Sequence, residues 1–239
     1  MSELTALLEL QSLDNTLDQL RYRHEHLPER QELTDIASEL DALTRAFAST
    51  EATREGLRKR ERDLEADATD VKEKAARLDG RLYDGSVTSP KEATTLTEEV
   101  ASLKARQSEL EDQAIELLVE IEPLDEHMVD AEAARGELEA RQADSTSRLE
   151  KATADLEGEI AAAESERATA AGLLTEDRLE QYRKLRITYG PAAIVEFDPD
   201  HSGGCPVAMS AVELDRWKHL PAGTLENCVD CGRLVAKLT

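Results

Sequence analysis

The clearest pattern in the sequence is a seven-residue repeat of apolar positions over residues 96–163. Its members are separated by alternating steps of four and three residues, which is typical of a coiled-coil seam. They are Leu96, Val100, Leu103, Gln107, Leu110, Ala114, Leu117, Ile121, Leu124, Met128, Ala131, Arg135, Leu138, Gln142, Ser145, Leu149, Ala152, Leu156, Glu159 and Ala163. The polar members can fix register at some loss of stability. A helix with such a stripe needs a partner helix to keep the stripe from water.

A second run of the same kind lies upstream, over residues 33–82. Its seam positions are Leu33, Ile36, Leu40, Leu43, Phe47, Thr50, Arg54, Leu57, Glu61, Leu64, Ala68, Val71, Ala75, Leu78 and Leu82. Between the runs, Gly85 and Pro90 are turn residues, and Ser89 suits a helix cap with Pro90 at the first helical position. We therefore expect an antiparallel coiled-coil hairpin over residues 1–174, with its tip at about 83–90. A parallel dimer of each helix with its own copy is the alternative.

Prolines divide this helical region further. Leucines from Leu4 to Leu20 predict a first helix, and Pro28 predicts a break or kink after it, because proline lacks a backbone donor and clashes with the preceding turn. Pro123 lies inside the second run, where the heptads continue in phase on both sides. There we expect a bend that does not end the helix.

Residues 175–239 have a different character. Thr175 is placed to cap a short helix from Glu176 to about residue 186, which Gly190 and the following proline would end. Residues 192–197 are apolar enough for a strand, residues 212–217 form a short apolar segment, and Leu234 begins a last strand. A region this small, with so few apolar groups, is expected to be only marginally stable unless a cross-link such as a metal ion stabilises it.

The composition favours a protein that buries a narrow coiled-coil seam rather than a large globular core. Charged residues make up 34% of the chain and aromatic residues 3%, and the formal net charge is −23. An acidic chain is not attracted nonspecifically to a phosphate backbone. No stretch approaches the roughly 20 apolar residues of a membrane span, and the first residues lack the basic and apolar regions of a secretory signal. We therefore expect a cytoplasmic protein.

The cysteines supply the candidate chemistry. Cys228 and Cys231 are two residues apart and are followed by Gly232, a spacing that lets two thiolates grip one Zn²⁺ at a tight turn. A complete zinc ribbon supplies a second such pair. Cys205 lies where the second cysteine of that pair belongs, but Ser202 occupies the first position.

These motifs resemble those of the bacterial C4-type zinc-ribbon family. The resemblance covers nearly the whole chain and rests on residues 89–92, 96–99, 110–112, 182–186 and the closing stretch 228–234. It implies a mainly α protein with a long antiparallel coiled-coil hairpin, followed by a small C-terminal zinc-ribbon-like β module in residues 175–239. It also implies an elongated, non-enzymatic protein that binds nucleic acid or protein partners.

Ser202 departs from the family pattern, because a neutral hydroxyl is a poor zinc ligand. One outcome is a site of Cys205, Cys228, Cys231 and His201. In another, water or an acidic residue such as Asp198 or Asp200 takes the fourth position. In the third, the metal is lost and the thiols remain as small buried groups.

Three classes of function follow. We favour an adaptor or scaffold, monomeric or weakly dimeric, that binds a protein partner through its coiled-coil arm or its ribbon. A regulatory protein that binds RNA or DNA is the alternative, although the acidic charge opposes it. A zinc hydrolase is least favoured, because catalytic zinc sites more often use His and carboxylates, and the sequence has no His-Glu-x-x-His motif.

Overall fold

The computed structural model describes residues 3–197 and 209–238. Its elements are α1 (Glu3–Glu25), α2 (Pro28–Tyr83), α3 (Pro90–Ala171), α4 (Glu176–Tyr189), a 3₁₀ helix (Gly190–Ala192), β1 (Ile194–Glu196), α5 (Ala211–His219), β2 (Leu225–Asn227) and β3 (Leu234–Ala236). The chain divides into two compact units, one of residues 1–31 with 146–239 and the other of residues 32–145. No helix within the described residues combines the length and apolar character needed to cross a bilayer.

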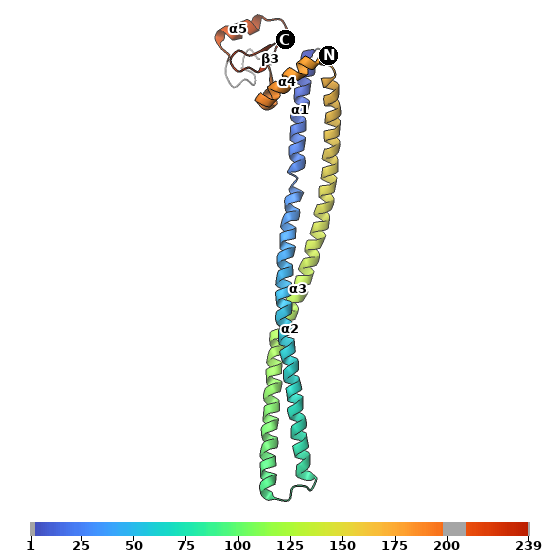
Figure 1. Ribbon diagram of the computed structural model, residues 1–239, viewed down its shortest axis with the longest axis vertical. Helices are drawn as coiled ribbons and strands as arrows, with labels where there is room; N and C mark the ends of the chain where they lie inside the picture. Colours follow the sequence, from blue (N-terminus) through green and yellow to red (C-terminus); the bar gives the residue numbers. More distant parts are fainter. Residues whose placement is uncertain (1–2, 198–208, 239) are drawn as a thin grey trace. The chain divides into compact units, whose positions relative to one another are not determined.

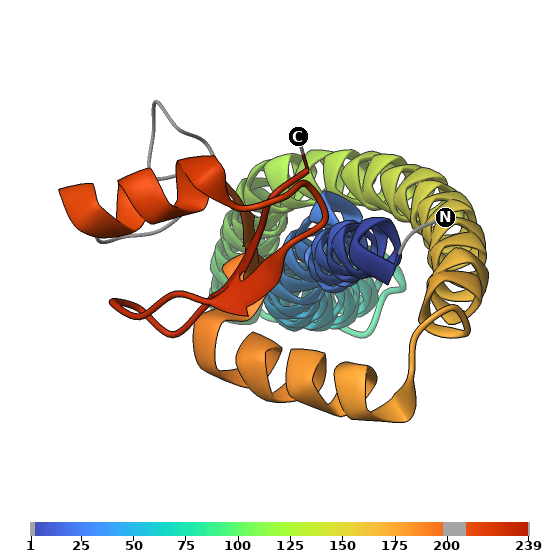
Figure 2. The ribbon, with the colours of Figure 1, turned by 90° about the horizontal axis from the view of Figure 1, so that it is seen from above.

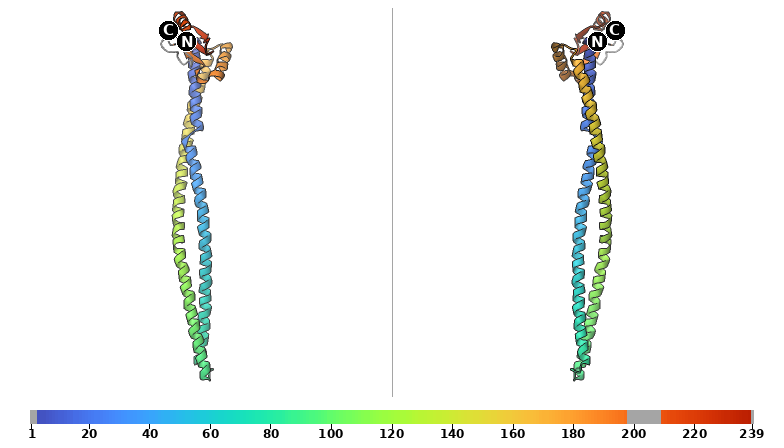
Figure 3. Two further views of the ribbon diagram at one scale, coloured as in Figure 1. Left: turned by 90° about the vertical axis from the view of Figure 1, so that its left-hand side faces the viewer. Right: turned by 90° about the vertical axis from the view of Figure 1, so that its right-hand side faces the viewer.

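Residues 32–145 form the expected antiparallel helical hairpin. Here α2 and α3 lie side by side (Figures 1 and 3) and pack through the predicted seam. Buried seam residues include Ile36, Ala68 and Ala75 of α2, and Leu96, Val100, Leu110, Ala114, Leu117 and Ile121 of α3. Every predicted seam position of α2 is buried or half-buried. The register read from the heptads is therefore confirmed for this helix.

Two predicted seam positions of α3 are instead exposed. Arg135 turns outward and pairs with Glu139 of the same helix at 2.8 Å. Glu159 is exposed, and its neighbour Ile160 packs with Leu17 and Leu20 of α1. The partner of this part of α3 is α1, which lies beyond the break at residues 26–27, so the buried position shifts by one residue there.

The predicted break before Pro28, the turn at Gly85 and the continuation of α3 through Pro123 are confirmed, and the bend expected at Pro123 stays a prediction. α1 ends at Glu25 and α2 begins at Pro28, whereas α3 continues through Pro123. At the tip, Gly85 adopts a positive φ of 82°, and the backbone N–H of Ser86 donates to the Asp84 carboxylate at 2.9 Å. Hydrogen bonding from Ser86, first from its side chain and then from its backbone N–H, lowers the pKa of Asp84. α3 then begins at Pro90, where a missing backbone N–H is harmless.

The other unit carries a three-stranded sheet of order β1-β3-β2, in which β1 and β3 are parallel and β2 and β3 antiparallel. Alternate residues face opposite sides. Ile194 and Leu234 pack with α1 and α4 in one apolar cluster, whereas Val195 and Val235 pack with Trp217 of α5 in another. Figure 2 shows the strands between α4 and α5. The predicted small β module is present, and its assignment as a zinc ribbon stays a prediction.

Candidate metal centre

The two closing cysteines lie in the turn between β2 and β3. Cys228 directly follows β2 and is 4% exposed, and Cys231 is half-buried. Both pack in the apolar cluster with Trp217 and Val235. The predicted pair is therefore brought to one tight turn, against the face of the sheet that α5 covers.

Backbone hydrogen bonds hold this turn closed. The Gly232 N–H donates to the Cys228 carbonyl at 2.9 Å, and the Cys228 N–H donates to the Arg233 carbonyl at 2.7 Å. The side chain of Asn227 also donates to the Gly232 carbonyl at 3.2 Å. Because the backbone is fixed on both sides of Cys228, the chain supplies a preformed turn for a ligand pair.

Gly232 is required at this turn for two reasons. Its φ is 76°, in the left-handed region that favours glycine. A Cβ built there would also collide with the hydroxyl of Tyr189 at the end of α4. Arg233 lies over the same tyrosine ring, 4.5 Å from its centroid, and donates through Nε to the Ala192 carbonyl at 3.0 Å. These contacts attach the turn to the end of α4.

The remaining predicted ligands, His201 and Cys205, lie outside the described residues, as do Ser202, Asp198 and Asp200. Within residues 3–197 and 209–238, no group of three or more His, Cys, Asp or Glu side chains could hold a metal ion. The described part thus contributes two thiols of a suitable donor type, Cys228 and Cys231. A third and fourth ligand would have to come from the segment between Phe197 and Met209.

A buried lysine supports α5, which packs over the cysteine turn. Lys237 is 9% exposed, and its ammonium donates to the carbonyls of Trp217, Lys218 and Leu220 at 3.0, 2.7 and 2.7 Å. These carbonyls lie at the C-terminal end of α5, where backbone donors run out and a cation is also favoured by the helix dipole; the Trp217 carbonyl accepts a bond from the Leu220 N–H as well. At the other end of α5, Ser210 accepts a hydrogen bond from the Glu213 N–H.

An ion pair also ties α5 to the sheet. Arg216 of α5 donates to Glu226 of β2 at 2.9 Å and to Glu213 of its own helix at 3.0 Å. The bond to Glu226, and after it the bond to Glu213, raises the pKa of Arg216. The module is thus organised by polar contacts as well as by its small apolar clusters.

The helical side of the unit contains a buried carboxylate. Asp14 of α1 is 7% exposed and accepts hydrogen bonds from Arg167 of α3 at 2.5 Å and from the Tyr182 hydroxyl of α4 at 2.7 Å. Arg186 approaches it at 3.8 Å. Burial, followed by the bond to Asp14, raises the pKa of Tyr182, and the bond to Asp14 raises that of Arg167. One acid thus joins three helices.

The edge of β1 is fastened to α1 by a side-chain amide. Gln11 donates to the Ile194 carbonyl at 2.8 Å and accepts from the Ile194 N–H at 2.6 Å. It therefore satisfies both backbone groups of one strand residue, as a neighbouring strand would. One turn later, Asn15 donates to the Pro191 carbonyl at 3.0 Å.

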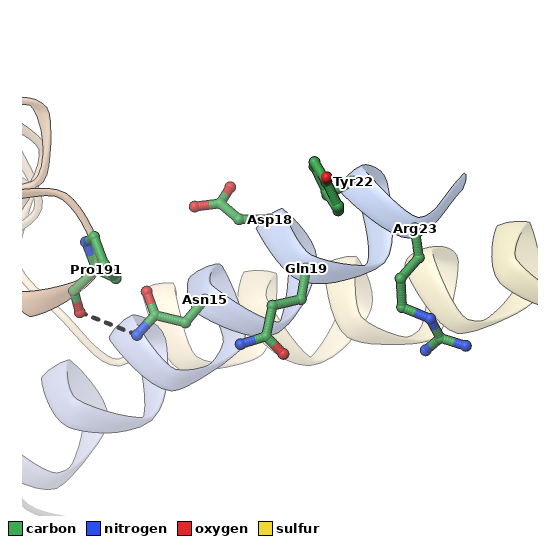
Figure 4. Close-up of a pocket in the computed structure, with 6 residues that line it drawn as sticks. All are labelled: Asn15, Asp18, Gln19, Tyr22, Arg23 and Pro191. Carbon is green, nitrogen blue, oxygen red and sulfur yellow. Dashed lines mark hydrogen bonds between the residues drawn. The ribbon is translucent and has the colours of Figure 1, made fainter. Parts of the chain in front are cut away.

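Beside this contact lies an open surface hollow of about 520 Å³, lined by Asn15, Asp18, Gln19, Tyr22, Arg23 and Pro191. Figure 4 shows Asn15, Asp18, Gln19, Tyr22 and Arg23 along α1, with Pro191 of the 3₁₀ helix hydrogen-bonded to Asn15 at one end. The lining offers amide, carboxylate and guanidinium groups, which are suited to polar recognition.

Comparison with solved structures finds the same fold. A protein from Mycobacterium smegmatis matches with a TM-score of 0.82 at 19% identity, covering 99% of this chain and 98% of that one. CT398 from Chlamydia trachomatis matches with a TM-score of 0.67 at 17% identity, covering 98% and 97%. At these identities the likeness concerns the fold alone.

Sequence comparison leads in the same direction. An uncharacterized protein of Mycobacterium tuberculosis is 26% identical over 233 residues, which cover 98% of this chain and 94% of the relative. The family model of the CT398-like coiled coil hairpin domain matches residues 10–190. That range includes the whole hairpin, the Asp14 junction and α4, so the chain belongs to the CT398-like coiled coil hairpin domain family.

Proposed function

We propose that the protein is a non-enzymatic cytoplasmic scaffold that binds another protein. One observation carries the proposal: the unit of residues 32–145 buries a narrow seam and leaves the outer positions of both helices exposed, including the apolar side chains Ile115, Val119 and Val129. A hairpin of this kind offers long outer surfaces for contact with a partner. The β module is a second docking element, with Val212 and Val229 exposed on it.

Affinity isolation of the full chain from extracts of its native cells tests this function. Half of each sample is treated with nuclease. The expected result is one protein that co-purifies in near-equal amounts, survives nuclease and binds again when both proteins are purified. Nucleic acid as the sole stable companion would overturn the proposal and support the regulatory alternative.

The nucleic-acid alternative has one specific observation in its favour. Arg54, Arg58, Lys59 and Arg62 line a surface hollow of about 430 Å³ together with Glu55. Against it, Arg54 and Arg58 are both paired with Asp125, and the chain carries a net charge of −23. A nucleic-acid-binding surface is expected to be strongly basic. We therefore place protein binding first.

We further propose that zinc staples the β module, held by Cys228 and Cys231 with Cys205 and His201. The support is the closed turn that carries the first two thiols, because structural zinc sites commonly begin from such a pair. A structural zinc supplies folding free energy directly, and a module with three-residue strands has few other sources.

Elemental analysis of protein purified without chelator tests the zinc site. We expect about one zinc per chain, almost none in Cys228→Ser, and no change in the exposed control Val229→Ser. Ser202→Cys should tighten binding, because a fourth thiolate replaces a weaker ligand. A large loss of affinity in His201→Ala would identify that histidine as a ligand. A metal-free wild-type protein with a folded, protease-resistant tail would overturn the zinc proposal and leave the scaffold proposal standing.

A further inference from the structure

An apolar patch lies on the outer surface of α3. Ile115, Leu118 and Val119 are 57%, 39% and 64% exposed and are spaced three and four residues apart, so they share one face of the helix. We call these three residues the α3 patch. Val129, two heptads beyond Ile115, lies on the same face and is 66% exposed. The seam residues Leu117 and Ile121 lie on the other side of α3, where they are buried against α2.

A basic stripe lies on the outer surface of α2. Arg58, Lys59 and Arg62, which we call the α2 stripe, line one side of the 430 Å³ hollow. Lys59 and Arg62 form no ion pair with any described residue. Arg58 is engaged inside the hairpin by Asp125, whereas the charges of Lys59 and Arg62 are not balanced by any contact with the described residues there.

Ion pairs show that the patch and the stripe share one face of the hairpin. Arg58 donates to Asp125 of α3 at 3.1 Å. Asp125 is one heptad after Leu118, so both lie on the same side of α3. Three further interhelical pairs, Lys74–Glu99, Arg81–Glu92 and Glu39–Arg141, lie on the opposite side of the seam. Because α3 runs antiparallel to α2, Arg62 lies nearer the level of the α3 patch than Arg58 does.

We propose that this face is a self-association surface, on which the α3 patch of one copy packs against the α2 stripe of a second copy. A two-fold axis parallel to the helices would place α3 of each copy beside α2 of the other copy, antiparallel to it and at the same level. The contact between patch and stripe therefore forms twice in the dimer. The aliphatic stems of Lys59 and Arg62 cover the patch, and their charged ends meet the acids beside it. Those acids include Glu122 and Glu126, which form no ion pair with described residues.

The same charges disfavour the simpler pairing of patch with patch. Two antiparallel copies of α3 centred on residue 117, within the patch, would bring Glu122 of each copy level with Asp112 of the other. Like charges facing each other oppose association. The net charge of the chain also repels a second copy, but salt at about 0.15 M screens charges more than about 8 Å apart. Contacts at the face itself are closer than this.

Sedimentation velocity of the full-length chain at about 0.15 M salt tests the surface. We expect a dimer that grows with concentration up to about 100 µM. The double variant Lys59→Glu/Arg62→Glu should weaken it about tenfold or more, and so should Glu122→Lys/Glu126→Lys. The control Arg60→Glu, next to Lys59 but facing the opposite side of α2, should sediment like the wild type.

Mixing the two double variants gives the decisive result. Each double variant places like charges at both contacts of its own dimer. In the mixed dimer, one contact pairs the new glutamates with the new lysines and the other pairs the native charges, so a mixed dimer should form. Circular dichroism of each variant confirms that the helices remain folded. The proposal is overturned if the wild type is monomeric throughout, if the double variants dimerise like the wild type, or if their mixture stays monomeric.

Discussion

The hydroxyl of Tyr182 in α4 donates a 2.7 Å hydrogen bond to the carboxylate of Asp14 in α1, inside the core of the unit that carries the sheet. Arg167 of α3 binds the other carboxylate oxygen. A buried carboxylate is stable only when charged or polar donors surround it. The position of α4, whose end contacts the cysteine turn through Tyr189, therefore depends on this acid.

Tyr182→Phe should destabilise this unit by about 1–3 kcal/mol, because it removes one donor and leaves a buried carboxylate oxygen poorly satisfied. Urea unfolding followed by the fluorescence of Trp217, the single tryptophan, measures the loss. Tyr22→Phe is the matched control, since Tyr22 is 63% exposed. Equal effects of the two substitutions would contradict the role given to the buried hydroxyl.

Alkaline pH should destabilise the same unit through Tyr182. Its pKa is raised in the folded state by burial, while the unfolded value stays near 10.0. Above about pH 10 the unfolded state loses this proton and the folded state keeps it, so stability falls as pH rises. Melting curves on both sides of that pH should show a steeper fall for wild type than for Tyr182→Phe. Parallel curves would show that Tyr182 ionises alike in both states.

Lys237→Met should loosen α5, because it removes the ammonium that donates to three carbonyls at the C-terminal end of the helix, of which the Trp217 carbonyl keeps the Leu220 N–H as a donor. Hydrogen bonds to charged groups typically contribute about 1.5–3 kcal/mol. The loss is measured by Trp217 fluorescence during denaturation. Lys218→Met, at an exposed position of the same helix, should change stability little, and a similar loss in both variants would count against the cap.

Leu117→Ala should destabilise the hairpin by about 2–5 kcal/mol, with the lower part of that range favoured by a narrow seam. Leu117 is 6% exposed, whereas its neighbour Glu116 is exposed. Far-ultraviolet circular dichroism during thermal unfolding compares Leu117→Ala with Glu116→Ala. The register would be refuted by equal shifts in melting temperature.

The hairpin could be predicted because its information is local and periodic. Each heptad of α2 places its apolar residues on the same side of the helix, so every repeat predicts the same buried face. Ser89 and Pro90 indicate where α3 begins. The seam prediction failed at Arg135 and at Glu159. At Glu159 the partner changes from α2 to α1, and the register depends on the break before Pro28. Such a shift is set by tertiary contacts that no repeat encodes.

The candidate site could be predicted only in part. The spacing of Cys228, Cys231 and Gly232 in the sequence is typical of a metal-binding turn, and the structure places all three residues in one turn. β2 was missed, because Leu225-Glu-Asn227 has no apolar run. The supports were missed as well: Gln11 and Lys237 act through contacts with residues far along the chain. Only Asp14 could have been noticed in the sequence, because it occupies an apolar position of the leucine repeat between Leu10 and Leu17.

The central claim is that the chain works by binding another protein, and photo-crosslinking in its native cells tests this most directly. The photoreactive residue p-benzoylphenylalanine replaces Val129, Ile187 or Val229, which are 66%, 88% and 69% exposed. The account predicts that at least one position gives a discrete, light-dependent adduct with a different protein, identified by mass spectrometry. Adducts only with nucleic acid, or no adduct with another protein at any of the three positions, would contradict it.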